Sequence, residues 1–170
     1  MGDLSEQIYL HHQGLYRYAY RLTGQSADAE DLVQETYLQA NRKLNTIKDL
    51  GSIKPWLFSI LRNQHLMRLR QRGKPVESLE DLGEWVAPVT NKEPEHDSEL
   101  LQRLLLEMPE SYRTPLILFY LEDFTYRDIS DQMGIPIGTV MSRLARAKDW
   151  IRTRYPVGDP PRPQLNREER

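Results

Sequence analysis

Hydrophobic residues recur along most of the chain with the three- and four-residue spacing of an α-helix. A first stripe runs over residues 4–22 and stops at Gly24, a residue that commonly ends helices. The same spacing predicts a second helix over about residues 26–44 and a third over about 52–72. No segment shows the alternation expected of a strand, so the pattern predicts an all-α fold.

The second predicted helix has one apolar face and one acidic face. Its apolar face contains Ala29, Leu32, Val33, Thr36, Ala40 and Leu44. Its opposite face carries Asp31, Gln34, Glu35 and, among these polar residues, Leu38. A single exposed leucine is normal on a protein surface. It is equally consistent with an anchor for a partner protein.

The stripes of the other two helices predict which of their side chains are buried. His12 lies on the first stripe, so we expect it to be a partly buried packing residue rather than a ligand for a metal. The third predicted helix has an apolar face made of Trp56, Leu57, Ile60, Leu61, Gln64 and Met67. Trp56 is therefore expected to contribute to the core.

The second half of the chain contains a candidate helix-turn-helix. Thr125 stands three residues before Asp128, the spacing of a capping box, and predicts the start of a short helix. Gly134 is placed to end this helix in the left-handed conformation, and Ile135 is placed to fill the corner that follows. A second helix is predicted over about residues 140–154, with Thr139 as its N-cap.

The two faces of this last helix differ in size and polarity. The face predicted to be buried consists of Val140, Leu144, Ala147 and Ile151. The opposite face consists of Met141, Ser142, Ala145, Arg146 and Asp149, while Arg143 and Trp150 lie on a flank. Small side chains and an arginine suit entry into the major groove of DNA. An ordinary helical hairpin in a bundle core would fit the apolar pattern equally well.

Composition excludes several classes of protein. The chain has 170 residues, a net charge of −2 and no cysteine, so it has no disulfide framework and no thiolate metal site. Its longest strongly apolar run, residues 116–121, is far too short to span a bilayer. We expect no signal peptide, since Asp3 and Glu6 stand where a basic segment would be required. These features together favour a cytoplasmic protein without insertion into a membrane.

Basic residues are concentrated in two segments of this slightly acidic chain. Residues 50–76 contain six basic residues and no acidic one, and residues 143–154 contain five basic residues against Asp149 alone. Basic segments of this kind predict contacts with nucleic acid. Because the whole chain has a pI near 6.1, each contact is expected to be weak by itself.

The pattern predicts two small helical domains joined by a linker. The first covers residues 1–73 and the second, which contains the helix-turn-helix, covers residues 97–156. Residues 74–96 are rich in proline, glycine and acidic residues and predict the linker. Residues 157–170 are proline-rich and charged and predict a disordered tail.

Three motifs occur in the order found in one known family. They are "DAEDLVQETYLQA" (28–40), "IKPWLFSILRNQHLMRLRQR" (53–72) and "MPESYRTPLILFYLEDFTYRDISDQMGIPIGTVMSRLARAKDWI" (108–151). Over about residues 8–154 the chain resembles bacterial RNA polymerase sigma factors of the extracytoplasmic-function (ECF) class. In this family the first motif docks on core polymerase, the second melts the promoter, and the third reads its upstream element. The resemblance implies core RNA polymerase, promoter DNA and an anti-sigma factor as partners.

The resemblance also implies roles for particular residues. The residues implied to bind polymerase are Asp31, Gln34, Glu35 and Leu38. The residues implied to contact the downstream promoter element are Arg62, Asn63, Arg68, Arg70 and Arg72. The residues implied to contact the upstream element are Thr139, Ser142, Arg143 and Arg146. Asn63 matches the asparagine that holds a flipped-out base, and Arg143, on the flank, suits either a phosphate or a carboxylate of the chain itself.

Three other functions fit the sequence less well than that of a sigma factor. A stand-alone helix-turn-helix regulator leaves the first domain without a function. A sigma mimic that binds only an anti-sigma protein would not need the two basic segments. For an enzyme we find no phosphate-binding glycine loop, no pair of histidines at a metal-binding spacing and no catalytic residues, and we expect no cofactor.

Overall fold

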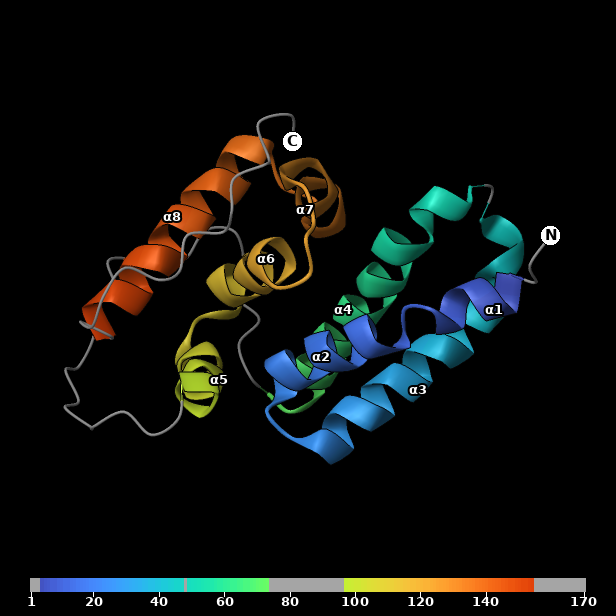
Figure 1. The fold of residues 1–170 in the computed structure, drawn as a ribbon, viewed down its shortest axis with the longest axis horizontal. Helices are drawn as coiled ribbons and strands as arrows, with labels where there is room; N and C mark the ends of the chain where they lie inside the picture. Colours follow the sequence, from blue (N-terminus) through green and yellow to red (C-terminus); the bar gives the residue numbers. More distant parts are fainter. Residues whose placement is uncertain (1–3, 48, 74–96, 155–170) are drawn as a thin grey trace. The chain divides into compact units, whose positions relative to one another are not determined.

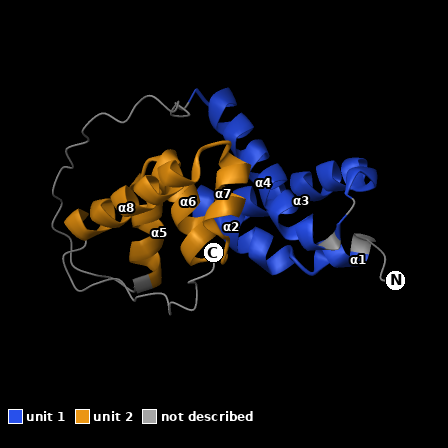
Figure 2. Ribbon diagram, turned by 90° about the horizontal axis from the view of Figure 1, so that it is seen from above, with its two compact units in different colours: residues 1–76 blue, residues 77–170 orange. Residues whose placement is uncertain are grey.

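A computed structural model of the protein describes residues 4–47, 49–73 and 97–154. Over these residues the chain forms eight α-helices and two short 3-10 helices and contains no strand, which confirms the predicted all-α class. The chain divides into two compact units, residues 1–76 and 77–170, coloured separately in Figure 2. The linker predicted over residues 74–96 and the tail predicted over 157–170 lie outside the described residues.

The first unit is built from four α-helices, of which α2, α3 and α4 pack against one another (Figure 1). Its elements are α1 (Leu4–Tyr9), α2 (His12–Thr23), α3 (Ser26–Lys43), the 3-10 helices Leu44–Thr46 and Leu50–Ser52, and α4 (Ile53–Gln71). Tyr18 of α2 and Phe58 of α4 are fully buried and stack with their ring centroids 5.2 Å apart. The apolar face predicted for α3 is buried from Ala29 to Ala40.

The first predicted helix is interrupted, and the prediction for His12 was wrong. The chain turns at Leu10 and His11, where the backbone N–H of His11 donates to the carbonyl of Ile8 at 3.2 Å. Because of this turn, the buried face of α2 does not continue the helical stripe of α1, on which Ile8 is buried. His12 is consequently exposed, and its Nδ1 forms a 3.0 Å hydrogen bond with the hydroxyl of Tyr37 on α3.

The buried face of α4 is wider than predicted. Its buried residues are Ile53, Leu57, Phe58, Ile60, Leu61, His65 and Leu66. Met67, predicted to be buried, is 49 % exposed, and both Trp56 and Gln64 are only partly buried. The reason is that α4 packs against α1, α2 and α3, so it is covered on more than one side. A single apolar stripe therefore describes this helix poorly.

The second unit contains α5 (Asp97–Glu107), α6 (Glu110–Tyr120), α7 (Tyr126–Met133) and α8 (Ile137–Arg154). Pro115 lies in the middle of α6. Glu110 stabilises the first turn of this helix. The carboxylate of Glu110 accepts hydrogen bonds from the guanidinium of Arg113 at 2.9 Å and from the hydroxyl of Thr114.

The helix-turn-helix predicted in this unit is formed by α7, a short turn and α8. Thr125 and Asp128 make the expected capping box: the N–H of Asp128 donates to the Thr125 hydroxyl at 3.0 Å, and the N–H of Thr125 donates to the Asp128 carboxylate at 3.2 Å. Gly134 adopts the left-handed conformation, with φ 64° and ψ 35°. Ile135 is buried in the corner, 5 % exposed.

The start of α8 differs from the prediction. The helix begins at Ile137, so Thr139 lies in its first turn and is not its N-cap. The carbonyl of Pro136 accepts hydrogen bonds from the N–H groups of Thr139 at 2.9 Å and Val140 at 3.1 Å. An N-cap carbonyl accepts the first bonds of a helix in this way. Pro136 therefore occupies the position that the sequence assigned to Thr139.

Candidate functional site

The outer face of α3 presents the polar residues predicted to bind a partner protein. Asp31, Gln34 and Leu38 are all exposed, and Leu38 has 59 % of its surface accessible. Their spacing of three and four residues places them on one side of the helix. Leu38 therefore contributes little to the core of this unit, and an apolar side chain is available to a partner among polar neighbours.

Glu35, the fourth residue of this group, is engaged differently. Its Oε1 lies 3.0 Å from the guanidinium Nη2 of Arg68 on α4, with the Glu35 side chain 46 % and the Arg68 side chain 20 % exposed. Arg68 also donates a long hydrogen bond, 3.4 Å, to the carbonyl of Asp28. The ion pair thus connects a residue predicted to bind polymerase with a residue predicted to bind DNA.

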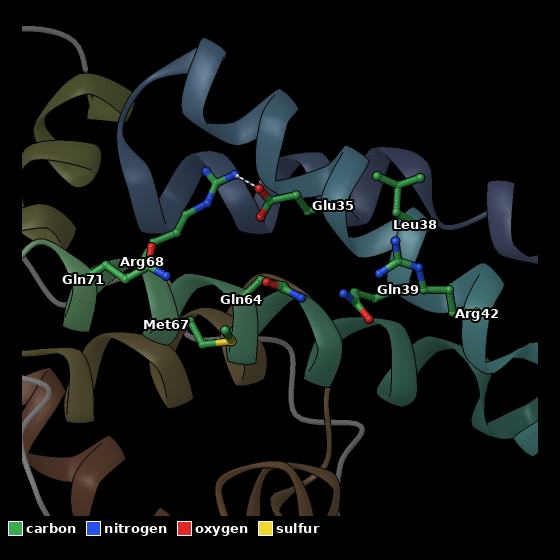
Figure 3. A pocket seen from close by; sticks show the side chains of 8 residues that line it. All are labelled: Glu35, Leu38, Gln39, Arg42, Gln64, Met67, Arg68 and Gln71. Atoms are coloured by element: carbon green, nitrogen blue, oxygen red, sulfur yellow. Dashed lines mark ion pairs between the residues drawn. The ribbon is translucent and has the colours of Figure 1, made fainter.

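A groove of about 320 Å³ runs between α3 and α4 beside this ion pair (Figure 3). Glu35, Leu38, Gln39 and Arg42 line it from α3, and Gln64, Met67, Arg68 and Gln71 line it from α4. Figure 3 shows the Glu35 and Arg68 side chains extending toward each other across the groove, with Leu38 further along α3. The lining combines charged and amide groups with two exposed apolar side chains, Leu38 and Met67.

The five residues of α4 predicted to contact the downstream element do not form one cluster. Arg68 and Arg72 reach α3, where Arg72 lies 3.7 Å from the carboxylate of Asp28. Asn63 and Arg70 are both exposed, and their separation of seven residues, about two helical turns, places them on one face. Arg62 is only partly exposed. Arg72 is also exposed, with 57 % of its side chain accessible, so the accessible part of this group is Asn63, Arg70 and Arg72.

The loop before α4 is held by short-range hydrogen bonds. The hydroxyl of Thr46 donates to the carbonyl of Lys43 at 2.6 Å. The carboxylate of Asp49 accepts a 3.1 Å hydrogen bond from the N–H of Gly51. These bonds order the chain on both sides of residue 48, which is itself outside the described residues.

On α8 the structure separates the four residues predicted to contact the upstream element. Ser142 and Arg146 are exposed and one turn apart, and Thr139 is partly exposed. The hydroxyl of Ser142 donates to the carbonyl of Thr139 at 3.1 Å. Arg143, in contrast, is only 6 % exposed and lies on the buried side of the helix with Val140. Its burial counts against a direct contact with DNA.

The second basic segment offers fewer free cations in the structure than in the sequence. Arg152 lies 3.4 Å from the carboxylate of Asp149. The guanidinium of Arg154 stacks on Trp150, 3.8 Å from the ring centroid, and burial lowers its pKa. Because Arg143 is buried as well, Arg146 is the arginine of this segment that is best placed to meet DNA.

At the start of α8 the structure exposes a pair of apolar residues, of which the sequence predicted only Met141. Ile137 is 43 % and Met141 is 48 % exposed, and the two lie one turn apart. Ile137 was overlooked because the helix was expected to begin after it. Met141 was predicted to lie on the outer face, but the apolar pair that it forms with Ile137 was not predicted.

Within residues 4–47, 49–73 and 97–154, no group of three or more histidine, aspartate or glutamate side chains is arranged to hold a metal ion. None of the helices in these ranges is long and apolar enough to cross a bilayer.

Comparisons with known families match both units. The family model described as "Sigma-70 region 2" matches residues 8–74, and the one described as "Sigma-70, region 4" matches residues 98–151. The first match contains α2, α3 and α4, with the ion pair and groove between the last two. The second contains the helix-turn-helix, including α8 up to Ile151.

Individual proteins are similar over most of the chain. The ECF RNA polymerase sigma factor SigM of Bacillus subtilis is 31 % identical over 157 residues, which cover 90 % of this chain and 96 % of the relative. SigE of Mycolicibacterium smegmatis is 35 % identical over 89 % of this chain, but the chain spans only 61 % of that protein. The solved structure of the sigma factor RpoE of Bartonella quintana, in complex with the anti-sigma factor NepR, is 28 % identical, with a TM-score of 0.72 over 89 % of this chain and 96 % of that one.

Proposed function

The chain belongs to the extracytoplasmic-function class of RNA polymerase sigma factors, and on this premise we propose which of its surfaces carry out each step of transcription initiation. It is an alternative sigma factor that binds core RNA polymerase and directs recognition of promoters. Its first unit corresponds to region 2 and its second to region 4 of the family.

The outer face of α3 binds core polymerase through Asp31, Gln34 and Leu38, with Glu35 at the edge of the interface. The observation that carries this assignment is the 59 % exposure of Leu38 on a helix that is otherwise acidic on this side. An exposed apolar side chain within a polar rim is the usual composition of an interface anchor. Leu38 also lines the groove between α3 and α4, so a concave surface lies next to the anchor.

The open face of α4 contacts the downstream promoter element. Asn63 presents an amide, which has both donors and an acceptor for a base edge, and Arg70 supplies a nearby positive charge for the DNA backbone. Arg68 contributes only when it leaves Glu35, whereas Arg72 stays largely exposed beside Asp28 and can also meet the DNA backbone. Arg62, partly exposed, lies beside Asn63 along the helix.

The outer face of α8 enters the major groove of the upstream element. Arg146 is suited to donate two hydrogen bonds to a guanine, and Ser142 lies one turn before it, toward the start of the helix. The helix N-terminus, which now begins at Ile137 and includes Thr139, attracts a phosphate. Arg143 supports the helix from its buried side.

The remaining assignments concern partners and location. We infer an anti-sigma factor as a regulatory partner, since the structural relative was solved with one. The chain acts in the cytoplasm, where the polymerase is, and performs no catalysis of its own. A stand-alone regulator is disfavoured because region 2 accounts for residues 8–74, and a sigma mimic is disfavoured because Asn63, Arg70 and Arg146 keep exposed DNA-binding groups.

Transcription from a promoter library by purified core polymerase tests this function. We expect run-off products only when the chain is added, and selection of defined bases in both promoter elements. A stand-alone regulator would bind DNA without polymerase and produce no transcript. A sigma mimic would bind polymerase or an anti-sigma factor but select no promoter.

A further inference from the structure

Ile137, Met141 and Ala145 form an exposed apolar row along the first half of α8. They are spaced four residues apart, and all three are exposed, Ile137 to 43 % and Met141 to 48 %. Residues at this spacing lie one above another on a helix. The row exists only because α8 starts at Ile137, which brings that residue into register with the other two.

The row lies on the same exposed surface as Ser142 and Arg146. At about 100° per residue, the order around the outer half of α8 is Met141, Ala145, Ser142 and Arg146, so Met141 and Arg146 lie toward opposite edges of this half. The buried residues Arg143 and Ala147 face the other way, into the unit. A DNA groove that encloses the outer half of the helix therefore meets both Met141 and Arg146.

We propose that this apolar row reads thymine, through contacts between Met141, supported by Ile137, and thymine C5-methyl groups in the upstream element. The proposal rests on the function proposed for α8. In the major groove the thymine methyl is the apolar group that a protein can contact, and apolar side chains are its usual partners. Methionine suits this contact because its unbranched thioether adapts to an irregular surface. Ala145 is short and leaves room for the DNA to approach.

A protein partner fits this row less well. Stable protein interfaces bury about 800 Å² on each side, with roughly 20–30 residues. The row is three residues long and one residue wide, and its neighbour on the outer surface is the polar residue Ser142, with Arg146 beyond it. A narrow apolar strip followed by a hydroxyl and an arginine matches base-pair edges, which combine a methyl group with hydrogen-bonding groups.

The consequence is a division of specificity along α8. Arg146 selects one base by hydrogen bonding, and the row selects one or more A·T pairs by the position of the thymine methyl. Replacing Met141 changes the preferred base at positions that do not depend on Arg146. This gives a role in specificity to two side chains that carry no charge and donate no hydrogen bond.

Thymine and uracil differ at C5 only by the methyl group, so their exchange tests the contact directly. Reconstituted holoenzyme first selects its upstream element from a library, and each thymine of that element, on either strand, is then replaced by uracil. We expect at least one replacement to weaken open-complex formation by about fourfold, the effect of losing about one buried methyl group. The same replacement should have no effect with Met141→Ala holoenzyme and should keep its effect with Met141→Leu.

Controls separate this proposal from the function on which it rests. Leu121→Ala changes another exposed apolar residue, 38 % exposed and outside α8, and should leave the uracil effect unchanged. Thermal midpoints of all variants should match, since Met141 is half exposed. Holoenzyme that selects upstream bases but is insensitive to every uracil replacement, or equally sensitive with Met141→Ala, overturns the thymine contact alone. Holoenzyme that selects no upstream bases overturns the function proposed for α8 and the thymine contact with it.

Discussion

The carboxylate of Glu35 on α3 lies 3.0 Å from the guanidinium of Arg68 on α4. One of these residues belongs to the face proposed to bind polymerase, and the other to the basic segment proposed to bind the melted promoter. While the pair is formed, the charge of Arg68 is partly neutralised. Polymerase binding at Glu35 and DNA binding at Arg68 are therefore expected to influence each other.

Glu35→Gln should free Arg68 for single-stranded DNA. Because both side chains are partly exposed, 46 % and 20 %, we expect the pair to stabilise the fold by no more than about 1 kcal/mol. Binding of the free protein to a single strand of the downstream element should tighten, and the slope of log affinity against log salt should steepen by roughly 0.7 for one more phosphate contact. Fluorescence anisotropy over a salt series measures both.

Glu30→Gln is the matched control for this variant, since Glu30 is exposed on the same helix and carries the same charge. It should leave the salt slope unchanged. An equal change of slope in the two variants would mean that net charge, and not the release of Arg68, controls DNA binding.

Leu38→Ala should weaken binding to core polymerase by about 1–3 kcal/mol, as expected of an interface anchor. Its thermal midpoint should remain close to that of the wild type, because the side chain is 59 % exposed in the free protein. Leu121→Ala removes an exposed leucine from the second unit and should bind polymerase normally. A large loss of stability in Leu38→Ala with normal binding would contradict the assignment.

Arg146→Ala should affect promoter recognition and Arg143→Ala should affect stability, although the two arginines are only three residues apart on α8. Arg146 is exposed, so its replacement should cost about 1–3 kcal/mol on the preferred promoter and relax selection at one base. Arg143 is 6 % exposed, so its replacement should lower the thermal midpoint and leave base selection by the folded protein intact. Thermal unfolding and library selection on both variants separate the two roles, and a base preference altered by Arg143→Ala would restore Arg143 as a DNA contact.

Two glycines of the helix-turn-helix should respond differently to alanine. A methyl group added at either Gly134 or Gly138 would meet no atom within 4 Å, so sterics with neighbours do not distinguish them. Gly134 has φ +64°, and alanine in this conformation should destabilise the domain by roughly 1–2 kcal/mol. Gly138 lies in α8 without a positive φ, so alanine should be neutral or stabilise by up to about 1 kcal/mol. Chemical unfolding of both variants tests the pair, and equal destabilisation would contradict the role of the left-handed turn.

Tyr37 should make stability depend on pH at alkaline values. Burial, together with the neighbouring Tyr9, raises the pKa of Tyr37 from 10 to about 12. The folded state therefore favours the protonated phenol, and this contribution is complete below pH 10 and is lost as the pH rises from about 10 to about 12. Tyr37→Phe should remove this part of the pH dependence in unfolding measurements. A wild type and variant with parallel profiles between these pH values would contradict the shift.

The sequence by itself determined the features that depend on residues close together in the chain. The capping box needs only Thr125 and Asp128, and the left-handed turn needs only Gly134, so both were predicted in place. The apolar face of α3 followed from periodicity because this helix is buried along one side. The order of three motifs along the chain was sufficient to indicate the sigma family.

The tertiary structure decided which polar side chains remain available. Arg143 stands beside outward-facing residues in sequence, yet packing within the second unit buries it. Glu35 and Arg68 are far apart in sequence, and only the packing of α3 on α4 brings their charges together. His12 is exposed, and not in the core as predicted, because the chain turns just before it. Ile137 belongs to α8 because the carbonyl of Pro136 accepts the first hydrogen bonds of the helix. Periodicity reports the face of one helix, whereas burial and pairing depend on neighbours that the local sequence does not specify.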